Sequence, residues 1–183
     1  MIRAVVTIGG PPGSGKSTAG RLVAARLGLE YRSAGEVFRA EGRRRGLSVE
    51  EFNRFAEAHP EVDRELDRAM QSLATPGHLI EGRIQGALCR RAGVPVHCIL
   101  VTASEEERVR RLAARDGQTL AEARDRLRAR EAMEQRRYLR DYGIDLAHET
   151  GDLSVDSTRV DPDGVAGSIV DFLRAREPDA GTA

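Results

Sequence analysis

The chain has 183 residues, which is enough for one domain with a buried core and too few for two ordinary domains. Lys and Arg total 29, as do Asp and Glu, and aromatic residues make up only 4%, so neither charge nor stacking surface favours nucleic acid or an anionic membrane. No stretch approaches the roughly 18 apolar residues of a membrane span, and two cysteines, Cys89 and Cys98, are too few for a disulfide framework, so we expect a cytoplasmic monomer without a membrane or nucleic-acid partner.

The first predicted elements are an apolar strand over residues 2–8 and a helix over residues 19–27. Between them lies GPPGSGKST, a full match to the phosphate-binding loop pattern GxxxxGK[ST] in the strand-to-helix context that the pattern requires. The alternative is a glycine-rich turn that binds nothing. The expected phosphate-binding residues are Gly10, Gly13, Ser14, Gly15, Lys16, Ser17 and Thr18.

Each residue type in this loop suits a polyphosphate ligand. Glycines allow backbone conformations in which successive N–H groups point at phosphate oxygens, and the following helix adds its positive N-terminal end. Lys16 supplies a mobile full charge, Ser17 offers a hydroxyl to Mg²⁺, and Thr18 a further hydroxyl near the phosphates.

Helical sequence occupies residues 33–75. The segment SAGEVFR, from Ser33 to Arg39, leads into one helix. Ser48 and Glu51 form a capping-box signature that starts a second helix, which runs to about residue 58. A third helix spans residues 61–73. In a small kinase such an insertion commonly holds the phosphate acceptor.

A second buried strand is predicted over residues 79–83, and it ends in the charged segment Glu81-Gly82-Arg83. Glu81 and Arg83 are two residues apart, so on an extended segment they point the same way, at the strand end where ligands bind in doubly wound folds. The alternative is a surface ion pair. A third apolar strand follows over residues 96–101, and a helix runs from residue 104 to 115.

The most charged part of the chain is residues 115–142, where Thr119 and Glu122 form a second capping box before a long, sparsely apolar helix. At a hundred degrees per residue, one face carries a charged set that would suit a mobile lid over a phosphoryl group. That set is Arg126, Arg130, Glu134 and Arg137. The alternative is a solvated face with ion pairs such as Glu122 with Arg126.

The chain ends with a short strand over residues 153–155, a closing apolar helix and a tail over residues 177–183 that we expect to fray. The pattern predicts one α/β domain over residues 1–183, with a parallel sheet between two layers of helices.

In order along residues 2–172, the segments GPPGSGKST, SAGEVFR, LSVEEFNRFAEAHPEVDRELDRAM, LIEGR, REAMEQRRY and YGIDL resemble the archaeal-type cytidylate kinases. The spacing from Arg130 to Arg137 also resembles the R-[DE]-x-x-[DE]-x-x-R lid pattern of the bacterial cytidylate kinases. The resemblance implies a P-loop NTPase fold, with residues 33–75 as the acceptor-binding insertion and residues 115–142 as an arginine-rich lid. It further implies Mg²⁺-dependent phosphorylation of CMP, and also dCMP, by ATP.

The resemblance also implies roles for single residues. Lys16 would bridge the donor phosphates, and Ser17 would hold Mg²⁺. The acceptor would be held by Ser33, Arg39, Glu81 and Arg83, with Arg83 on its α-phosphate. Arg130 and Arg137 would act as catalytic cations on the transferring phosphoryl group and the acceptor phosphate, oriented by Glu134.

One position departs from the family pattern. Bacterial cytidylate kinases follow the strand-end Gly-Arg with an Asp that reads cytosine, whereas Ile84 stands here. The open candidates for its replacement are Asp63, Asp67, Arg64 and Gln71, and ordinary surface charge is the alternative for each. Two other functions stay open: a kinase for AMP, UMP or a small alcohol, and a P-loop ATPase that acts as a binding or assembly factor.

Overall fold

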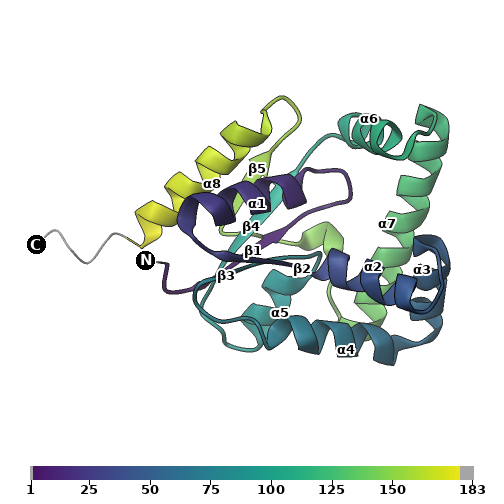
Figure 1. The fold of residues 1–183 in the computed structure, drawn as a ribbon, viewed down its shortest axis with the longest axis horizontal. Helices are drawn as coiled ribbons and strands as arrows, with labels where there is room; N and C mark the ends of the chain where they lie inside the picture. Colours follow the sequence, from purple (N-terminus) through teal and green to yellow (C-terminus); the bar gives the residue numbers. More distant parts are fainter. Residues whose placement is uncertain (1, 178–183) are drawn as a thin grey trace, which may run out of the picture.

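The computed structural model describes residues 2–177, and these contain a parallel sheet between two layers of helices (Figure 1). The strand order is β2-β3-β1-β4-β5. The strands are β1 (Val5–Gly9), β2 (Glu30–Ser33), β3 (His78–Glu81), β4 (Val96–Thr102) and β5 (Leu153–Asp156). The helices are α1 (Lys16–Leu27), α2 (Ala34–Arg44), α3 (Val49–Ala58), α4 (Pro60–Gln71), α5 (Gln85–Arg91), α6 (Glu105–Asp116), α7 (Leu120–Tyr142), the 3₁₀ turn η1 (Leu146–His148) and α8 (Pro162–Arg176). The predicted three-layer α/β fold is confirmed.

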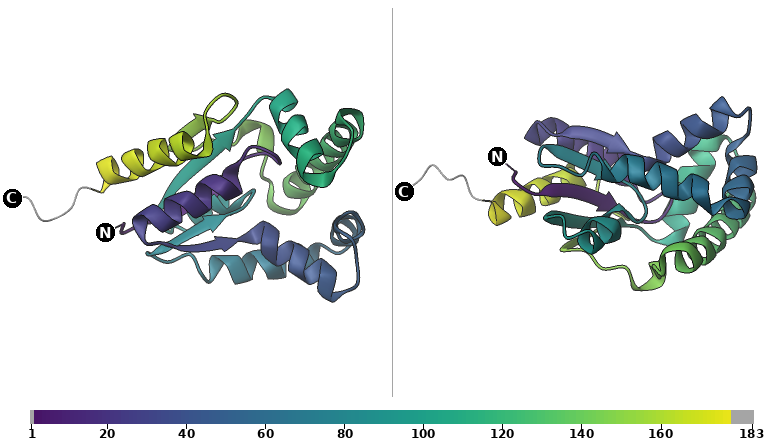
Figure 2. Two further views of the ribbon diagram at one scale, coloured as in Figure 1. Left: turned by 45° about the horizontal axis from the view of Figure 1, so that its top comes forward. Right: turned by 90° about the horizontal axis from the view of Figure 1, so that it is seen from below.

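Alternation along β1 explains the two layers. Val6 and Ile8 belong to a buried cluster with the apolar faces of α1 and α8, which lie side by side (Figures 1 and 2). Val5, on the opposite face, packs with Met70 of α4 and Cys89 of α5. Because successive side chains of a strand point to opposite faces, the continuous apolar run marks a strand that is covered on both sides.

The structure corrects the predicted elements in two places. β2 and α5 were not expected, because the exposed Glu30 and Arg32 interrupt any apolar run in β2 and α5 is only seven residues long. β2 pairs with β3 along its whole length, from Glu30 opposite His78 to Ser33 opposite Glu81. Two boundaries also shift, since β1 begins at residue 5 rather than 2 and α1 at residue 16 rather than 19.

Helices α2, α3 and α4 lie between β2 and β3, where helical sequence was predicted, and α7 lies beyond the carboxyl ends of the strands (Figure 1). Both capping boxes are confirmed, at Ser48 with Glu51 and at Thr119 with Glu122. Within the described part of the chain, no helix combines the length and the apolar character needed to cross a membrane.

Helix α7 is better anchored than its sequence predicts. Ala123 and Leu127 are buried against an apolar face of α6 formed by Val109, Leu112 and Ala113. The sparse apolar positions in the sequence therefore understate how firmly the first half of α7 is held, because a few well-placed small and apolar residues are enough to bury one stripe.

The predicted tail begins too early. The carboxylate of Glu177 accepts a hydrogen bond from the backbone N–H of Ala4 at 3.0 Å and lies 2.9 Å from Nε2 of His97. Residue 177 is therefore fixed against the start of the chain, and the remainder of the predicted tail, residues 178–183, lies outside the described residues.

Candidate active site

The phosphate-binding loop has the backbone that the glycines require. Gly10, Gly13 and Gly15 have φ values of 137°, 79° and 86°, a region that residues with a side chain rarely adopt. A Cβ atom on Gly10 would also lie 2.0 Å from the carbonyl oxygen of Val101, so no larger residue fits there. The first turn of α1 follows at once, with its free N–H groups at the loop.

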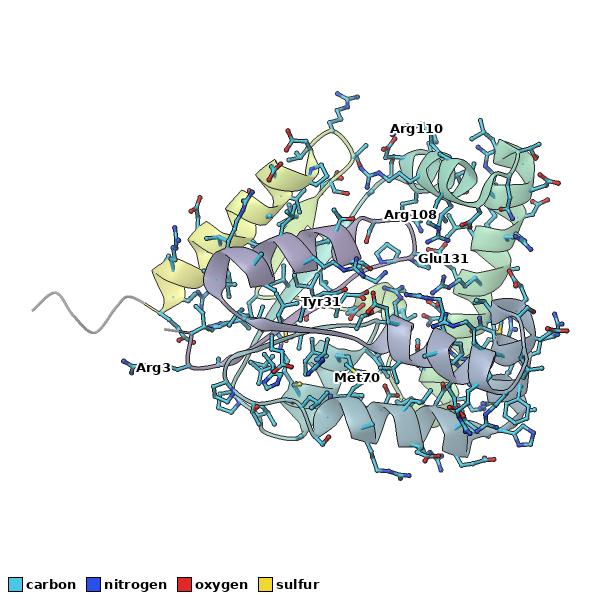
Figure 3. The ribbon with its side chains drawn as sticks, in the orientation of Figure 1. Arg3, Tyr31, Met70, Arg108, Arg110 and Glu131 are labelled. Carbon is cyan, nitrogen blue, oxygen red and sulfur yellow. The ribbon has the colours of Figure 1, made fainter. Side chains whose placement is uncertain are left out.

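Arg108 of α6 links the loop to α7. The guanidinium donates a hydrogen bond to the carbonyl oxygen of Pro12 at 3.3 Å, and the same Nη1 lies 2.5 Å from Oε1 of Glu131 on α7. Figure 3 shows Arg108 and Glu131 facing each other beside the loop. Because Arg108 binds a carbonyl oxygen of the loop, the contact uses none of the backbone N–H groups that a phosphate would need.

A second arginine and a serine hold the loop in the same way. Nη1 of Arg111 donates to the carbonyl oxygen of Gly13 at 3.4 Å and to Oγ of Ser157 at 2.9 Å. Oγ of Ser157 in turn donates to the carbonyl oxygen of Ser14 at 2.7 Å. The sequence did not single out Arg108, Arg111 or Ser157, because arginines on a polar helix look like ordinary surface charge.

Lys16 is turned toward the end of β3. Its Nζ lies 3.8 Å from Oε1 of Glu81 and donates a hydrogen bond to the carbonyl oxygen of Pro11 at 3.3 Å. Burial lowers the pKa of Lys16. Glu81 is fixed by hydroxyl donors from Ser33 at 2.5 Å and Tyr31 at 3.3 Å, and burial raises the pKa of Tyr31 to about 12.

Arg83, which follows β3, reaches two carboxylates. Its Nε lies 3.4 Å from Oε2 of Glu134 on α7, and its Nη1 donates to Oε2 of Glu149 at 3.4 Å. Arg130 donates from Nε to Oε1 of Glu134 at 2.7 Å. Burial favours the neutral form of Glu134, but Arg130 and Arg83 outweigh burial and hold its pKa below the usual value.

Glu149 was also missed by the sequence analysis. Burial raises its pKa, with Arg83 and Lys16 acting in the opposite direction. We call the six converging side chains the charge cluster. It consists of Lys16, Glu81, Arg83, Arg130, Glu134 and Glu149.

Neither of the two surface ion pairs considered from the sequence forms, Glu81 with Arg83 or Glu122 with Arg126. Glu81 is buried and Arg83 largely so, and each is paired with other groups rather than with its neighbour. Glu122 serves its capping box, while Arg126 pairs with Glu50 of α3 at 3.4 Å, so the expected Glu122–Arg126 pair does not form.

Two of the predicted site arginines, Arg39 and Arg137, lie outside the charge cluster. Arg39 is exposed on α2 and folds back toward Gly35. Arg137 is only 3% exposed, with Nε 3.0 Å from Oδ2 of Asp63 on α4. Its guanidinium lies over the rings of Phe38 and Tyr138, at 5.6 and 5.2 Å from their centroids.

The residues considered as readers of the base differ in whether their polar groups already have hydrogen-bond partners. Asp67 accepts hydrogen bonds from Gln85 at 2.7 Å and from the hydroxyl of Tyr142 at 2.5 Å. Gln71 donates to Gln85 at 2.8 Å. Ile84 is fully buried, so its hydrocarbon side chain supplies no polar group to a ligand.

A cavity of about 490 Å³ opens on the other side of the phosphate-binding loop, between the start of α1, α6 and the loop before α8. Its lining includes Thr18, Arg110, Arg111, Thr158 and Pro162. This volume falls in the range of small-molecule sites.

No complete metal site is built from protein groups alone. Within residues 2–177, no three His, Cys, Asp or Glu side chains gather closely enough to hold a metal ion. The oxygen donors at hand are the hydroxyl of Ser17, at the start of α1, and the carboxylates of Glu81 and Glu149.

Comparison with known proteins gives one family match and close relatives. Residues 9–128 match the family described as "AAA domain". The chain is 38% identical over 175 residues to the cytidylate kinase of Archaeoglobus fulgidus, which covers 94% of this chain and 96% of that protein. It is 37% identical over 179 residues to the cytidylate kinase of Halobacterium salinarum, covering 96% and 92%.

Solved structures agree on the fold. The shikimate kinase of Acinetobacter baumannii in complex with shikimate has a TM-score of 0.61 and covers 96% of this chain and 96% of its own. The sequence identity is 17%, so this likeness concerns the fold alone.

Proposed function

The chain belongs to the cytidylate kinases, and on that premise we propose that its charge cluster transfers a phosphoryl group from ATP to CMP, giving CDP and ADP, and to dCMP, giving dCDP. The observation that carries this proposal is the meeting of Arg83, from the end of β3, with Arg130, from the lid, on one carboxylate beside Lys16. Cations from three separate elements thus surround one small volume, as a phosphoryl group between donor and acceptor needs.

The donor side uses the loop and the neighbouring cavity. Free backbone N–H groups of residues 13–18, in the loop and at the start of α1, bind the ATP phosphates, and Lys16 bridges them. The 490 Å³ cavity leads away from the loop past Thr18 and Arg111, and it receives the nucleoside of ATP.

Magnesium fits the donor set. Mg²⁺ keeps several waters and takes few protein oxygens besides the substrate phosphates, which agrees with the absence of a protein-only cage among the described residues. Ser17 would bind the ion directly, and Glu81 and Glu149 would hold its waters. When bound, Mg²⁺ neutralises charge on the phosphates.

The acceptor side lies between the end of β3 and the helical insertion, residues 33–75. Arg83 binds the α-phosphate of the acceptor, and Ser33 and Arg39 lie on the insertion side. The attacking phosphate oxygen is already anionic, so the reaction needs positioning and charge stabilisation rather than a general base. Glu81 and Glu134 keep Lys16 and the arginines in place until the phosphates arrive.

The lid, residues 115–142, supplies the last cations. Arg130 faces the charge cluster and acts on the transferring phosphoryl group, while Arg137, about two turns further along α7, acts on the acceptor nucleotide. The lid also excludes water, so that transfer to the acceptor outruns hydrolysis.

The direct test is identification of the products. Purified protein with Mg-ATP and either CMP or dCMP should give CDP or dCDP in a one-to-one ratio with ADP, read by anion-exchange chromatography. ADP formation without a phosphorylated acceptor would contradict the proposal and favour a P-loop ATPase that acts as a binding or assembly factor. The cytoplasmic location and the monomeric state stay predictions, the latter testable by light scattering.

A further inference from the structure

The unsatisfied buried polar atoms of the described residues all lie around the site. Six side-chain atoms have no hydrogen-bond partner, namely Oγ of Ser14, Nε of Arg83, Oε2 of Glu134, Oδ2 of Asp63 and both Nε and Nη1 of Arg137. The first three belong to the phosphate-binding loop and the charge cluster. Since buried polar groups are nearly always hydrogen-bonded, the other three mark a place where a further part of the ligand completes them.

The position of Asp63 and Arg137 suits the nucleoside of the acceptor. Arg137 is three residues beyond Glu134 on α7, which is just under one turn, or about 5 Å along the axis. An acceptor held at Arg83 by its phosphate therefore extends along α7 toward this pair. The ring of Phe38 lies on the same side, under the guanidinium of Arg137, so an aromatic side chain adjoins the pair.

The pair itself is incomplete. Oδ2 of Asp63 and Nε of Arg137 are 3.0 Å apart, yet neither has a hydrogen-bond partner, so the contact is an ion pair without hydrogen-bond alignment. Both residues are almost fully buried. Burial raises the pKa of Asp63 to about 6 in spite of Arg137, as expected for a carboxylate short of donors.

The neighbouring acid, Asp67, has no carboxylate oxygen without a hydrogen-bond donor. Both oxygens of Asp67 are engaged, one by Gln85 and the other by Tyr142, and Gln71 completes the amide of Gln85. Arg64, the fourth candidate, is exposed. Asp67 therefore ties α4 to α5 and α7, and Asp63 is left to face the ligand.

We propose that Asp63 and Arg137 read the base of the acceptor: the Asp63 carboxylate accepts a hydrogen bond from the 4-amino group of cytosine, and the Arg137 guanidinium donates to N3 and O2. This assignment rests on the proposed function and supplies the base-reading groups that Ile84 cannot. Uracil presents a carbonyl oxygen to the carboxylate and an N–H to the guanidinium, so the same pair rejects UMP.

The test is the change of Asp63 to Asn, with kcat/KM measured for CMP, dCMP and UMP. The Asn amide can accept from cytosine and donate to uracil, so the CMP-to-UMP ratio of kcat/KM should fall roughly 10- to 100-fold, the size of one specific polar contact. The dCMP value should fall in step with that of CMP. The matched control is Asp67→Asn, one turn away on α4, which should lower CMP and UMP together and leave their ratio unchanged.

Two outcomes would overturn the assignment. Equal losses with CMP and UMP in Asp63→Asn would make the pair purely structural, and a loss with CMP that spares dCMP would place Asp63 at the 2′-hydroxyl of the sugar. If Asp63→Asn fails to fold, the CMP-to-UMP ratio of kcat/KM in Arg137→Lys decides in the same way. A wild-type enzyme that phosphorylates neither CMP nor dCMP defeats the proposed function itself, whereas normal wild-type activity with an unchanged ratio in the variant defeats only this inference.

Discussion

At the scale of single residues, the charge cluster shows how cations are kept ready for phosphate. Lys16, Arg83 and Arg130 lie near one another in a largely buried place, where like charges would repel and solvation by water is limited. Glu81 and Glu134 compensate that repulsion while no phosphate is bound. We therefore expect these carboxylates to act by placing the cations rather than by moving protons.

Replacement of Lys16 by Ala should lower kcat by a factor on the order of a thousand or more while the protein stays folded. The reason is that its ammonium acts on charge in the transition state, and its removal also relieves a buried charge. Steady-state ADP release and a thermal melt measure the two effects. An unchanged turnover number would remove the loop from the mechanism.

Replacement of Arg137 by Ala should cost on the order of a hundredfold in kcat/KM, because the variant loses its contacts to the acceptor nucleotide. The control is Arg124→Ala on the same helix, whose half-exposed side chain lies 4.0 Å from Glu105 and away from the site. Arg124→Ala should change kcat/KM less than twofold. Equal, small effects of both changes would mean that Arg137 does not contact the acceptor.

The raised pKa of Asp63 predicts that the stability of the protein depends on pH. Burial raises its pKa in the folded state from 3.8 to about 6, so its protonated form favours folding, and that contribution is present below pH 4 and is lost as the pH rises through 6. Between pH 5 and 7.5 the wild type should therefore lose about 1 kcal/mol in free energy of unfolding relative to Asp63→Asn. Urea unfolding at both pH values measures the difference.

The surrounding charges are the same in both proteins and cancel in that comparison. They are Arg137, Asp67, Asp141 and Arg140. A stability difference between wild type and Asp63→Asn that does not change with pH would mean that Asp63 keeps an ordinary pKa.

At the scale of elements, α7 is built in two halves. Its first half is bound to α6 by apolar contacts, and its second half meets α4 through polar contacts, such as Arg137 with Asp63 and Tyr142 with Asp67. When a ligand binds, its polar groups can replace polar contacts between helices more readily than they can replace buried apolar contacts. We therefore expect α6 and the first half of α7 to move together as the rigid part of the lid.

The change Leu127→Ala should lower the free energy of unfolding by about 2–4 kcal/mol, because Leu127 is only 2% exposed in the seam between α6 and α7. Leu139→Ala is the matched control on the same helix, where the side chain is 50% exposed, and it should cost less than about 0.5 kcal/mol. Chemical denaturation measures both. Similar values for the two variants would contradict the anchored seam.

The elements differ in how well the sequence predicts them. The phosphate-binding loop and both capping boxes follow local rules, so the residues around Lys16, Ser48 and Thr119 were predicted from short patterns. β2 was not, because its stability comes from pairing with β3, which no local pattern contains. α5 is one short helix whose buried polar residue, Gln85, hides its apolar stripe.

The residues of the site also differ in how well the sequence predicts them. Lys16, Arg83 and Glu134 were predicted, and the structure brings them together, because the motif, the strand end and the lid spacing each locate one residue. Glu149 and the pairing of Asp63 with Arg137 could not be predicted, since they join residues 66 and 74 positions apart in the sequence. Such contacts depend on how the helical insertion and the lid pack together.

At the scale of the whole molecule, the parallel sheet explains why these distant segments meet. All strands end at the same edge, so the loop after β1, Arg83 after β3 and the lid after β4 face one another there (Figure 1). The 490 Å³ cavity and helices α2, α3 and α4 lie on either side of Lys16, so in the proposed function the donor and acceptor phosphates would meet at this edge of the sheet.

The central claim is that this arrangement serves one acceptor class, and an acceptor panel tests it most directly. ADP release from Mg-ATP would be measured with CMP, dCMP, UMP, AMP, GMP and shikimate supplied separately. The account predicts strong stimulation by CMP and dCMP and weak stimulation by the others. Preference for AMP or shikimate, or slow ATP hydrolysis that no acceptor stimulates, would contradict it.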